Sequence, residues 1–356
     1  MQTLDFIVQP RIAARLSLAE DSHFLHVVGR RSRLRAGTAR VYACPGDLLS
    51  LGRYHVVPNP LPVGSSVQLH RRHSGGRAIP FGDGFIGFAM VLPHRSALFS
   101  TNPFALAPYQ VMNRYVRGLL DGLKLVNVAA FYPGRDFVTV DRRVLALVSF
   151  AVDPAGALLF EAVIANRRNF SVLPHMLDEV DKRGVIKSEM LLPENMTCLA
   201  EELRTNLSTE DVADMLRRGY EKQFVLEFDH HELTPLEQRK MEATAGHESQ
   251  GEHWIRQRQY RAELDHHAIS RVQLGVLEAY FALEQDRFIK EIVLAGDFIA
   301  NEGAIERLES ELRLCPAEWR AIDAIASQIF AQPENFILGI GPLRTITDTI
   351  VKGLVR

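Results

Sequence analysis

Residues 71–92 read RRHSGGRAIPFGDGFIGFAMVL, the most informative stretch of the chain. Small residues and cations gather in its first half and an apolar run, Phe85–Leu92, follows, which predicts a loop that leads into a buried strand. Glycine lets main-chain N–H groups approach a ligand without a Cβ in the way, and flanking arginines suit a phosphate or a carboxylate. The stretch therefore indicates a site for an anionic ligand with an apolar part. A glycine-rich turn between two strands, with solvated arginines, fits the same residues about equally well.

Length and composition describe a globular chain of enzyme size. At 356 residues the chain is too long for one small core, so we expect two domains. Its 47% hydrophobic and 24% charged residues are typical of a soluble protein. The formal net charge of −2 gives no reason to expect nucleic acid as a partner. A basic run at residues 30–35 lacks interleaved aromatic residues, and we interpret it as a solvated loop or helix end.

The cysteines and the apolar segments indicate the compartment. Three cysteines occur, Cys44, Cys198 and Cys315, and an odd number of cysteines so far apart implies no disulfide framework. No uninterrupted apolar span reaches membrane length, and the first residues lack the basic and apolar regions of a signal peptide. We therefore expect a cytoplasmic protein in a reducing environment, with no membrane partner.

The apolar periodicity changes twice along the chain and divides it into three parts. Residues 1–228 alternate between helical and strand patterns, which predicts a mixed α/β domain. Residues 229–267 are rich in His, Glu, Gln and Arg, and we expect a polar linker that carries a helix. Residues 268–356 predict a small α+β domain. The expected strands are 39–43, 48–51, 67–69, 85–92, 126–130, 137–140, 144–152, 158–165, 271–283 and 288–295, and the expected helices are 11–29, 108–123, 174–181, 208–221, 305–312, 317–331 and one after Pro342.

Common catalytic and metal-binding motifs are absent from the sequence. It contains no P-loop, no His-Glu-x-x-His, no paired Cys-x-x-Cys and no Gly-x-Ser-x-Gly elbow. The histidines within residues 230–267 match no zinc spacing and stand among carboxylates, so we expect a solvated linker and no metal site. Cys198 fits a buried small hydrophobe at a helix start better than a nucleophile.

Four segments in a fixed order carry a resemblance to a known family. They read Leu-Gly-Arg-Tyr-His at 51–55, Arg-Arg-His-Ser-Gly-Gly at 71–76, Tyr-Pro-Gly-Arg-Asp at 132–136 and Ile-Lys-Glu-Ile-Val-Leu-Ala-Gly-Asp-Phe at 289–298. In this order and spacing they resemble the motifs of the lipoate–protein ligase and octanoyltransferase families. The resemblance spans nearly the whole chain, and the four segments are more specific together than any one alone.

The resemblance implies a fold, a reaction and its participants. The fold is the biotin/lipoate protein ligase type, a mixed α/β sheet domain with helices, followed by a small α+β accessory domain. The reaction is activation of lipoate or octanoate by ATP and Mg²⁺ to an acyl-adenylate, then transfer to a lysine of a lipoyl carrier domain, of the E2 or glycine-cleavage H type. An apolar tunnel lined by strand residues such as Phe88, Val148 and Phe150 would bury the acyl chain. The residues implied in binding the acyl-adenylate are Arg53, Arg72, Ser74, Gly75, Gly76, Arg77, Ala78, Gly134, Arg135 and Asp136.

The chain departs from the family pattern at several positions. Arg77 stands where the family has a third glycine, and Phe81 where a histidine usually follows. The family's lysine falls by ungapped alignment on Arg143 and the glycine after it on Ala146. The usual His-Gly segment reads Phe-Glu-Ala at 160–162, and no cysteine lies at the acyltransferase nucleophile position.

These departures leave two hypotheses open, and the lack of a suitably placed cysteine argues against a third, acyl transfer from an acyl carrier protein. The first is a lipoate–protein ligase in which Arg143 clamps charge at the reacting group, because arginine keeps the positive charge although it is bulkier and effectively never deprotonated. The second is a catalytically impaired relative that binds a lipoyl or acyl carrier, or serves as a subunit of a lipoate-handling complex. An exposed arginine at a strand turn, without a functional role, also fits Arg143.

Overall fold

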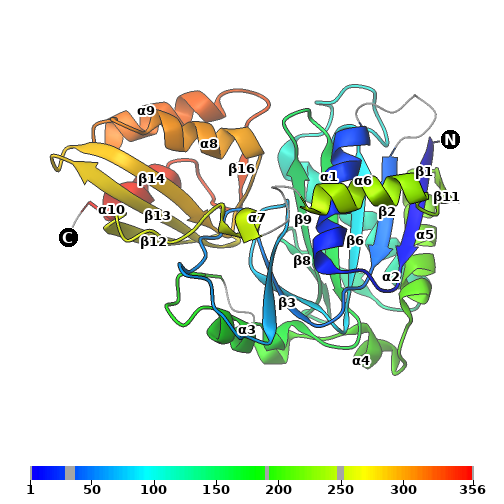
Figure 1. The fold of residues 1–356 in the computed structure, drawn as a ribbon. Helices are drawn as coiled ribbons and strands as arrows, with labels where there is room; N and C mark the ends of the chain where they lie inside the picture. The colour runs from blue at the N-terminus through cyan, green and yellow to red at the C-terminus, as the bar shows by residue number, and fades with distance from the viewer. Residues whose placement is uncertain (1, 29–36, 189–191, 247–251, 355–356) are drawn as a thin grey trace.

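The computed structural model describes residues 2–28, 37–188, 192–246 and 252–354, and the basic run at 30–35 lies outside them. The described chain forms two units that lie side by side (Figure 1). The N-terminal unit holds a large and a small sheet, whereas the C-terminal unit, yellow to red in Figure 1, holds a three-stranded sheet packed against helices.

An eight-stranded sheet forms the body of the N-terminal unit, in the order β11-β1-β2-β6-β10-β9-β8-β7. β1 pairs parallel with both β11 and β2, and the other neighbours pair antiparallel. The central strands are buried on both faces, which explains why their sequences are nearly continuous apolar runs. The strands are β1 (Gln2–Gln9), β2 (Gly37–Tyr42), β6 (Phe85–Leu92), β7 (Ala130–Phe131), β8 (Phe137–Val140), β9 (Arg143–Val152), β10 (Leu158–Ala165) and β11 (Leu226–His230).

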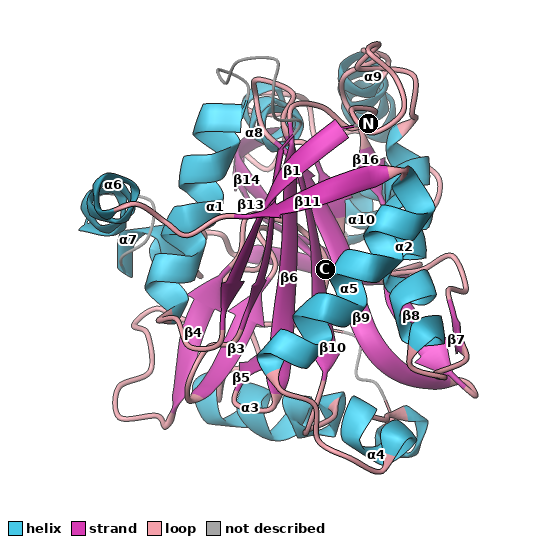
Figure 2. Cartoon of the chain, turned by 90° about the vertical axis from the view of Figure 1, so that its right-hand side faces the viewer, coloured by secondary structure: helices cyan, strands magenta, loops and turns pink. Residues whose placement is uncertain are grey.

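Helices cover both faces of this sheet (Figure 2). One face carries α1 (Ala14–Val28) and α6 (Pro235–Gly246), and the other carries α2 (Val111–Leu125) and α5 (Thr209–Phe224). The two cores on either side of the sheet are therefore separate apolar clusters.

Glycines let α2 and α5 approach each other closely. A Cβ at Gly219 of α5 would stand 2.3 Å from the carbonyl oxygen of Gly118 and 2.6 Å from the Cα of Gly122, both on α2. The start of α5 is a capping box, in which Ser208 Oγ accepts from the Asp211 amide at 3.1 Å and the Asp211 carboxylate accepts from the Ser208 amide at 2.9 Å.

A smaller sheet in the order β4-β3-β5 packs onto the face that α1 covers. Its strands are β3 (Asp47–Leu51), β4 (Val67–Arg71) and β5 (Ile79–Gly82). One side of this sheet faces the large sheet, and α3 (Leu173–Val180) covers its other side. The loop between β4 and β5 is therefore placed between the two sheets of the N-terminal unit.

The C-terminal unit has its own apolar core between an antiparallel sheet, in the order β12-β13-β14, and three helices. A short two-stranded pair, β15 with β16, lies beside the large sheet's β9. The elements are β12 (His266–Val272), β13 (Gly275–Glu284), β14 (Phe288–Gly296), β15 (Ile299–Ala300), β16 (Ile337–Leu338), α8 (Glu302–Glu311), α9 (Trp319–Phe330) and α10 (Thr345–Lys352), with α4 (Leu199–Leu203) and α7 (Glu252–Arg256) earlier in the chain.

The mixed α/β fold class expected from the sequence is confirmed. The segment expected to be a polar linker contacts the rest of the protein at several of its described residues. Its first residues complete β11, Trp254 Nε1 donates to the carbonyl of Arg71 at 2.8 Å, and Gln259 bridges to Val57. β12 begins at His266, within the same segment.

Candidate functional site

The loop between β4 and β5 is held together by its own arginine. Arg72 donates from Nη2 to the carbonyls of Gly75 (2.8 Å) and Arg77 (2.7 Å), from Nη1 to that of Ser50 (3.0 Å), and from Nε to Ser74 Oγ (3.1 Å). A guanidinium has five N–H donors. Most of the donors expected to face a phosphate are therefore used to shape the loop.

The two glycines of the loop face the C-terminal unit. The Gly76 amide, at φ +89°, donates to the carbonyl of Phe298 at 2.8 Å. A Cβ at Gly75 would stand 2.2 Å from the same carbonyl oxygen, so glycine is required for this approach. Ser149 Oγ of β9 donates to the Gly75 carbonyl at 2.9 Å. The turn before β15 thus covers the glycine backbone that the resemblance assigns to the ligand.

A buried ion pair occupies the position of the expected third glycine. Arg77 Nε lies 2.5 Å from Asp136 Oδ2 and Nη2 lies 2.9 Å from Oδ1, while Nη2 also donates to the carbonyl of Leu274 at 3.1 Å. Both side chains are almost fully buried. Two parallel N–H···O bonds are the strongest arrangement of this pair, and the loop is thereby joined to the turn at 134–136 and to the C-terminal unit.

The space between the two sheets is small and is lined by both apolar and polar side chains. Its cavity measures about 30 Å³, room for one or two water molecules, whereas a pocket for a ligand of drug size measures roughly 300–1,000 Å³. The lining residues are Tyr42, Ser50, His70, Arg72, Gly76, Arg77, Ile79, Phe81, Asp136, Leu147, Val148, Ser149, Glu161, Ala162 and Val163.

The expected acyl tunnel is wrong, because all three of its residues belong to the apolar core on the other face of the large sheet, although Val148 also borders the cavity. Phe88 and Phe150 belong to the apolar core on the opposite face of the large sheet, where Phe88 packs on Tyr220 and Phe150 stacks on Phe336. Side chains alternate between the faces of a strand, and the residues that face the cavity are the polar neighbours, Ser149 among them.

Buried charges surround the cavity. Burial lowers the pKa of Arg72 to about 10, while Glu161 and Asp136 act in the opposite direction. Burial raises the pKa of Glu161, against hydrogen bonds from Ser74 and the charge of Arg72. The pocket therefore presents two acids, Asp136 and Glu161, and two guanidinium groups at close quarters, beside apolar side chains.

A second buried cluster lies behind Tyr42, between β2 and α1. Arg40 forms ion pairs with Glu20 and Asp21 and lies over the ring of Tyr42, 4.9 Å from its centroid. Burial raises the pKa of Asp21 to about 7, although Arg40 opposes this shift. On the side of Tyr42, the pocket is therefore backed by a network of buried ion pairs.

Arg143 does not meet the loop. It lies at the start of β9, where Nη2 pairs with Glu202 at 2.7 Å and Nη1 lies 3.5 Å from Thr197 Oγ1. The loop meets β9 at Ser149, six residues further on and about 20 Å along an extended strand. The structure therefore does not bring together the two parts of the expected site.

The remaining expected site residues lie at the junction of the units. Arg53 donates its amide to the Ser74 carbonyl at 2.9 Å and pairs through its side chain with Glu302 of α8. Arg135 Nη2 donates to the carbonyl of Gln273 at 2.6 Å, and Gly134 adopts φ +84° in open space. Ala78 is buried beneath the small sheet.

The polar residues of β9 and β10 were not among the residues expected to bind a ligand. Ser149 and Glu161 interrupt the apolar runs LALVSFAV and LLFEAVIA, and a polar residue inside a buried strand needs a partner. A polar residue within an apolar strand could therefore have identified both Ser149 and Glu161 from the sequence.

Alternative chemistries find no support among the described residues. No group of three or more His, Cys, Asp or Glu side chains is placed to hold a metal ion in residues 2–28, 37–188, 192–246 and 252–354. All three cysteines are buried, and burial raises the pKa of the Cys198 thiol. Within the same ranges, no helix has both the length and the apolar character needed to cross a bilayer.

Comparisons with known proteins agree on the fold. No family model matches the sequence, and no curated protein matches it. Among solved structures, the lipoate-bound complex of LipL1 from P. falciparum aligns over 98% of this chain and 99% of its own, at 12% identity and a TM-score of 0.69.

Two further structures each align over 71% of this chain. Lipoate–protein ligase A bound with ATP aligns over 71% of this chain and 98% of its own, at 14% identity and a TM-score of 0.54. The bipartite lipoate protein ligase of Thermoplasma acidophilum aligns over 71% and 96%, at 15% identity and a TM-score of 0.55. Together with the sheet order, the loop and the joined C-terminal unit, these likenesses show that the chain has the lipoate–protein ligase fold.

Proposed function

We propose that this protein uses the lipoate–protein ligase fold to bind a lipoyl carrier domain without activating lipoate. The observation that carries this proposal is the buried Arg77–Asp136 pair in the pocket between the sheets. A lipoyl chain cannot enter a cavity of about 30 Å³ unless this pair separates. Separating the pair would leave two buried charges without their partners, so the closed pocket is the stable state.

The donors that acyl activation needs are also engaged. Stabilising an adenylate requires preorganised N–H groups that are free to meet the developing charge. Here the Gly76 amide is bonded to Phe298 and the Arg72 guanidinium to the loop carbonyls. Arg143 is bonded to Glu202 instead of facing the pocket.

The proposed partner is a lipoyl domain of the E2 or glycine-cleavage H type. The Thermoplasma acidophilum ligase that shares this fold was described together with its E2 lipoyl domain. Because the pocket is closed, we propose that the carrier domain binds an outer surface of the protein.

A second candidate function is the complete ligase reaction with ATP and Mg²⁺. The fold is shared with structures that hold lipoate and ATP, and the loop at 72–78 retains its Ser-Gly-Gly core. This candidate requires the C-terminal unit to release the Gly76 amide and Arg77 to leave Asp136 before lipoate binds.

One experiment separates the two candidates. The protein is mixed with an unmodified E2 lipoyl domain, lipoate, ATP and Mg²⁺, and the carrier is followed by intact mass. In parallel, calorimetry measures carrier binding with and without ATP. We expect no gain of a lipoyl mass and carrier binding that is independent of ATP. A lipoyl mass on the carrier would replace the first candidate by the second, and absence of carrier binding would remove the first.

A further inference from the structure

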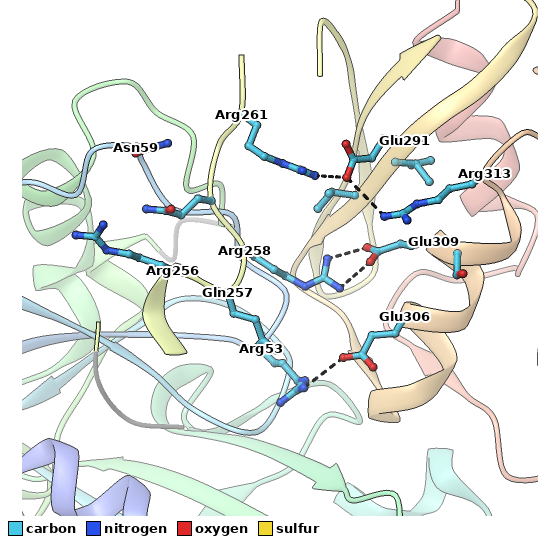
Figure 3. Close-up of a pocket in the computed structure, with 14 residues that line it drawn as sticks. Arg53, Asn59, Arg256, Gln257, Arg258, Arg261, Glu291, Glu306, Glu309 and Arg313 are labelled. Carbon is cyan, nitrogen blue, oxygen red and sulfur yellow. Dashed lines mark hydrogen bonds and ion pairs between the residues drawn. The ribbon is translucent and has the colours of Figure 1, made fainter. Parts of the chain in front are cut away.

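A deep groove lies at the junction of the two units, outside the pocket between the sheets (Figure 3). It measures about 500 Å³, and the segment 256–261 forms one wall while β14 and α8 form the other. Arg53 and Asn59 of the N-terminal unit also line it. Its volume exceeds that of the pocket between the sheets more than tenfold, so a ligand or a partner segment enters here without any rearrangement.

The inner arginines of the groove are neutralised. Arg258 makes two bonds to Glu309, at 2.7 and 3.1 Å, and lies over the ring of Tyr54. Arg53 pairs with Glu302 and lies 3.7 Å from Glu306. These pairs fix the walls; two arginines face three carboxylates there, so the inner part of the groove carries about one unit of negative charge.

The rim of the groove carries an excess of positive charge. Arg261 and Arg313 approach the same carboxylate, Glu291, at 2.9 and 3.6 Å (Figure 3). One carboxylate balances one guanidinium, so about one unit of positive charge remains there. Both arginines are exposed, by 41% and 59% of their side-chain surface, and reach a partner without burial cost.

Neutral groups between these charges suit a peptide backbone. Asn59, Gln257, Gln259 and Ser310 line the groove and offer amide and hydroxyl groups to main-chain atoms. The Nε2 donor of Gln259 is buried without an acceptor among the described residues, which a partner's carbonyl or carboxylate would supply. None of the described side chains that line the groove is aromatic, so nothing there stacks on a nucleotide base.

We propose that the junction groove is the docking site for an acidic, extended segment of the carrier domain. This assignment rests on the proposed carrier-binding function and names the surface that performs it. The segment's carboxylates pair with Arg261 and Arg313, and its backbone bonds the amides between them. Because the Arg53 amide also holds the Ser74 carbonyl, the docked segment lies next to the glycine loop and bridges both units.

Charge reversal at the rim tests the proposal. Calorimetry measures binding of an unmodified E2 lipoyl domain, and separately of a hexaglutamate peptide, to the full-length protein at low and moderate salt. Arg313→Glu and Arg261→Glu are each expected to weaken binding about tenfold and to reduce its salt dependence. The control is Arg218→Glu on α5. The Arg218 side chain is similarly exposed (55%) and lies 3.8 Å from Asp214, a similarly loose pair. We expect this variant to bind with unchanged affinity.

The outcomes distinguish the groove assignment from the proposed carrier binding. If the wild type binds the lipoyl domain and both rim variants bind it equally well, the groove assignment is wrong and the carrier function stands. If no lipoyl domain binds the wild type, the proposed function fails. In that case, hexaglutamate that binds the wild type but neither rim variant still supports an acidic segment at the groove. Hexaglutamate that does not bind the wild type overturns the groove assignment.

Discussion

At the scale of single residues, the Arg77–Asp136 pair keeps the pocket between the sheets closed. The double variant Arg77→Gly with Asp136→Asn removes both charges and the guanidinium that fills the pocket. We expect it to gain measurable affinity for lipoate in calorimetry, whereas the wild type shows none, because a cavity of about 30 Å³ admits no acyl chain.

Stability measurements control this experiment. Arg77→Gly alone leaves Asp136 charged and buried, and we expect the free energy of unfolding in urea to fall by about 3–5 kcal/mol. The double variant is expected to lose less, since the amide of asparagine is neutral. A double variant as stable as expected that still fails to bind lipoate would show that other side chains close the pocket.

The histidine of the same loop predicts a pH dependence. His73 lies 2.8 Å from Ser22 Oγ and against Trp254, and burial lowers its pKa to about 3. The unfolded chain binds this proton near pH 6.5 and the folded protein does not, so the stabilising effect is complete above pH 6.5 and is lost as pH falls toward 3.

Comparison with a variant isolates that effect. Between pH 7 and pH 5 the unfolding free energy of the wild type is expected to fall about 1–2 kcal/mol more than that of His73→Gln. Asp21, whose raised pKa has the opposite sign, contributes equally to both proteins and cancels. Parallel pH profiles for the two proteins would contradict the assignment to His73.

Residue identities predicted part of the site. The sequence identified the arginine–glycine loop and marked Arg77 as a departure from the family pattern. The partner of Arg77, Asp136, lies 59 positions away, and their contact depends on how the sheets pack. The face on which Phe88 and Phe150 lie also depends on tertiary packing, since both faces of this sheet are apolar.

At the scale of elements, the contact between α2 and α5 depends on the absence of side chains. Gly219→Ala would place a Cβ 2.3 Å from the Gly118 carbonyl, and neither helix backbone can yield. We expect a loss of about 1–3 kcal/mol in the free energy of unfolding, measured with urea. Gly303→Ala in α8, where nothing lies within 4 Å, is the matched control and is expected to stabilise by about 0.5–1 kcal/mol.

Periodicity predicted some elements to the residue and missed others of the same length. The strands expected at 85–92, 137–140 and 158–165 match β6, β8 and β10 residue for residue, and the capping box at Ser208 starts α5. β1 and β5 were not predicted. β5 is four residues long and contains Pro80. Proline normally argues against a strand, but β5 is an edge strand of the small sheet, where proline is tolerated.

At the scale of the whole molecule, the two units are joined by packed aromatic rings and buried polar contacts. Phe298 stacks on Tyr54 with centroids 4.5 Å apart, and His55 Nε2 lies 3.0 Å from Asp297 Oδ1. We therefore expect the wild type to unfold in one calorimetric transition.

Removing the central ring tests this coupling. Phe298→Ala is expected to cost about 3–5 kcal/mol and to split the transition into two. Phe288→Ala removes the same ring from a site that is 37% exposed on β14 and should preserve a single transition. A single transition in Phe298→Ala would mean that the buried polar contacts suffice to couple the units.

The position of β1 inside the large sheet constrains how the protein is made. Its neighbour β11 is encoded more than two hundred positions later, so the nascent chain carries an unsatisfied row of amides and carbonyls on one side of β1 while the ribosome completes the intervening segment. At about 5–20 residues per second this interval lasts roughly ten to forty seconds. During translation that bare edge is the place where a chaperone would have to shield the polypeptide from aggregation.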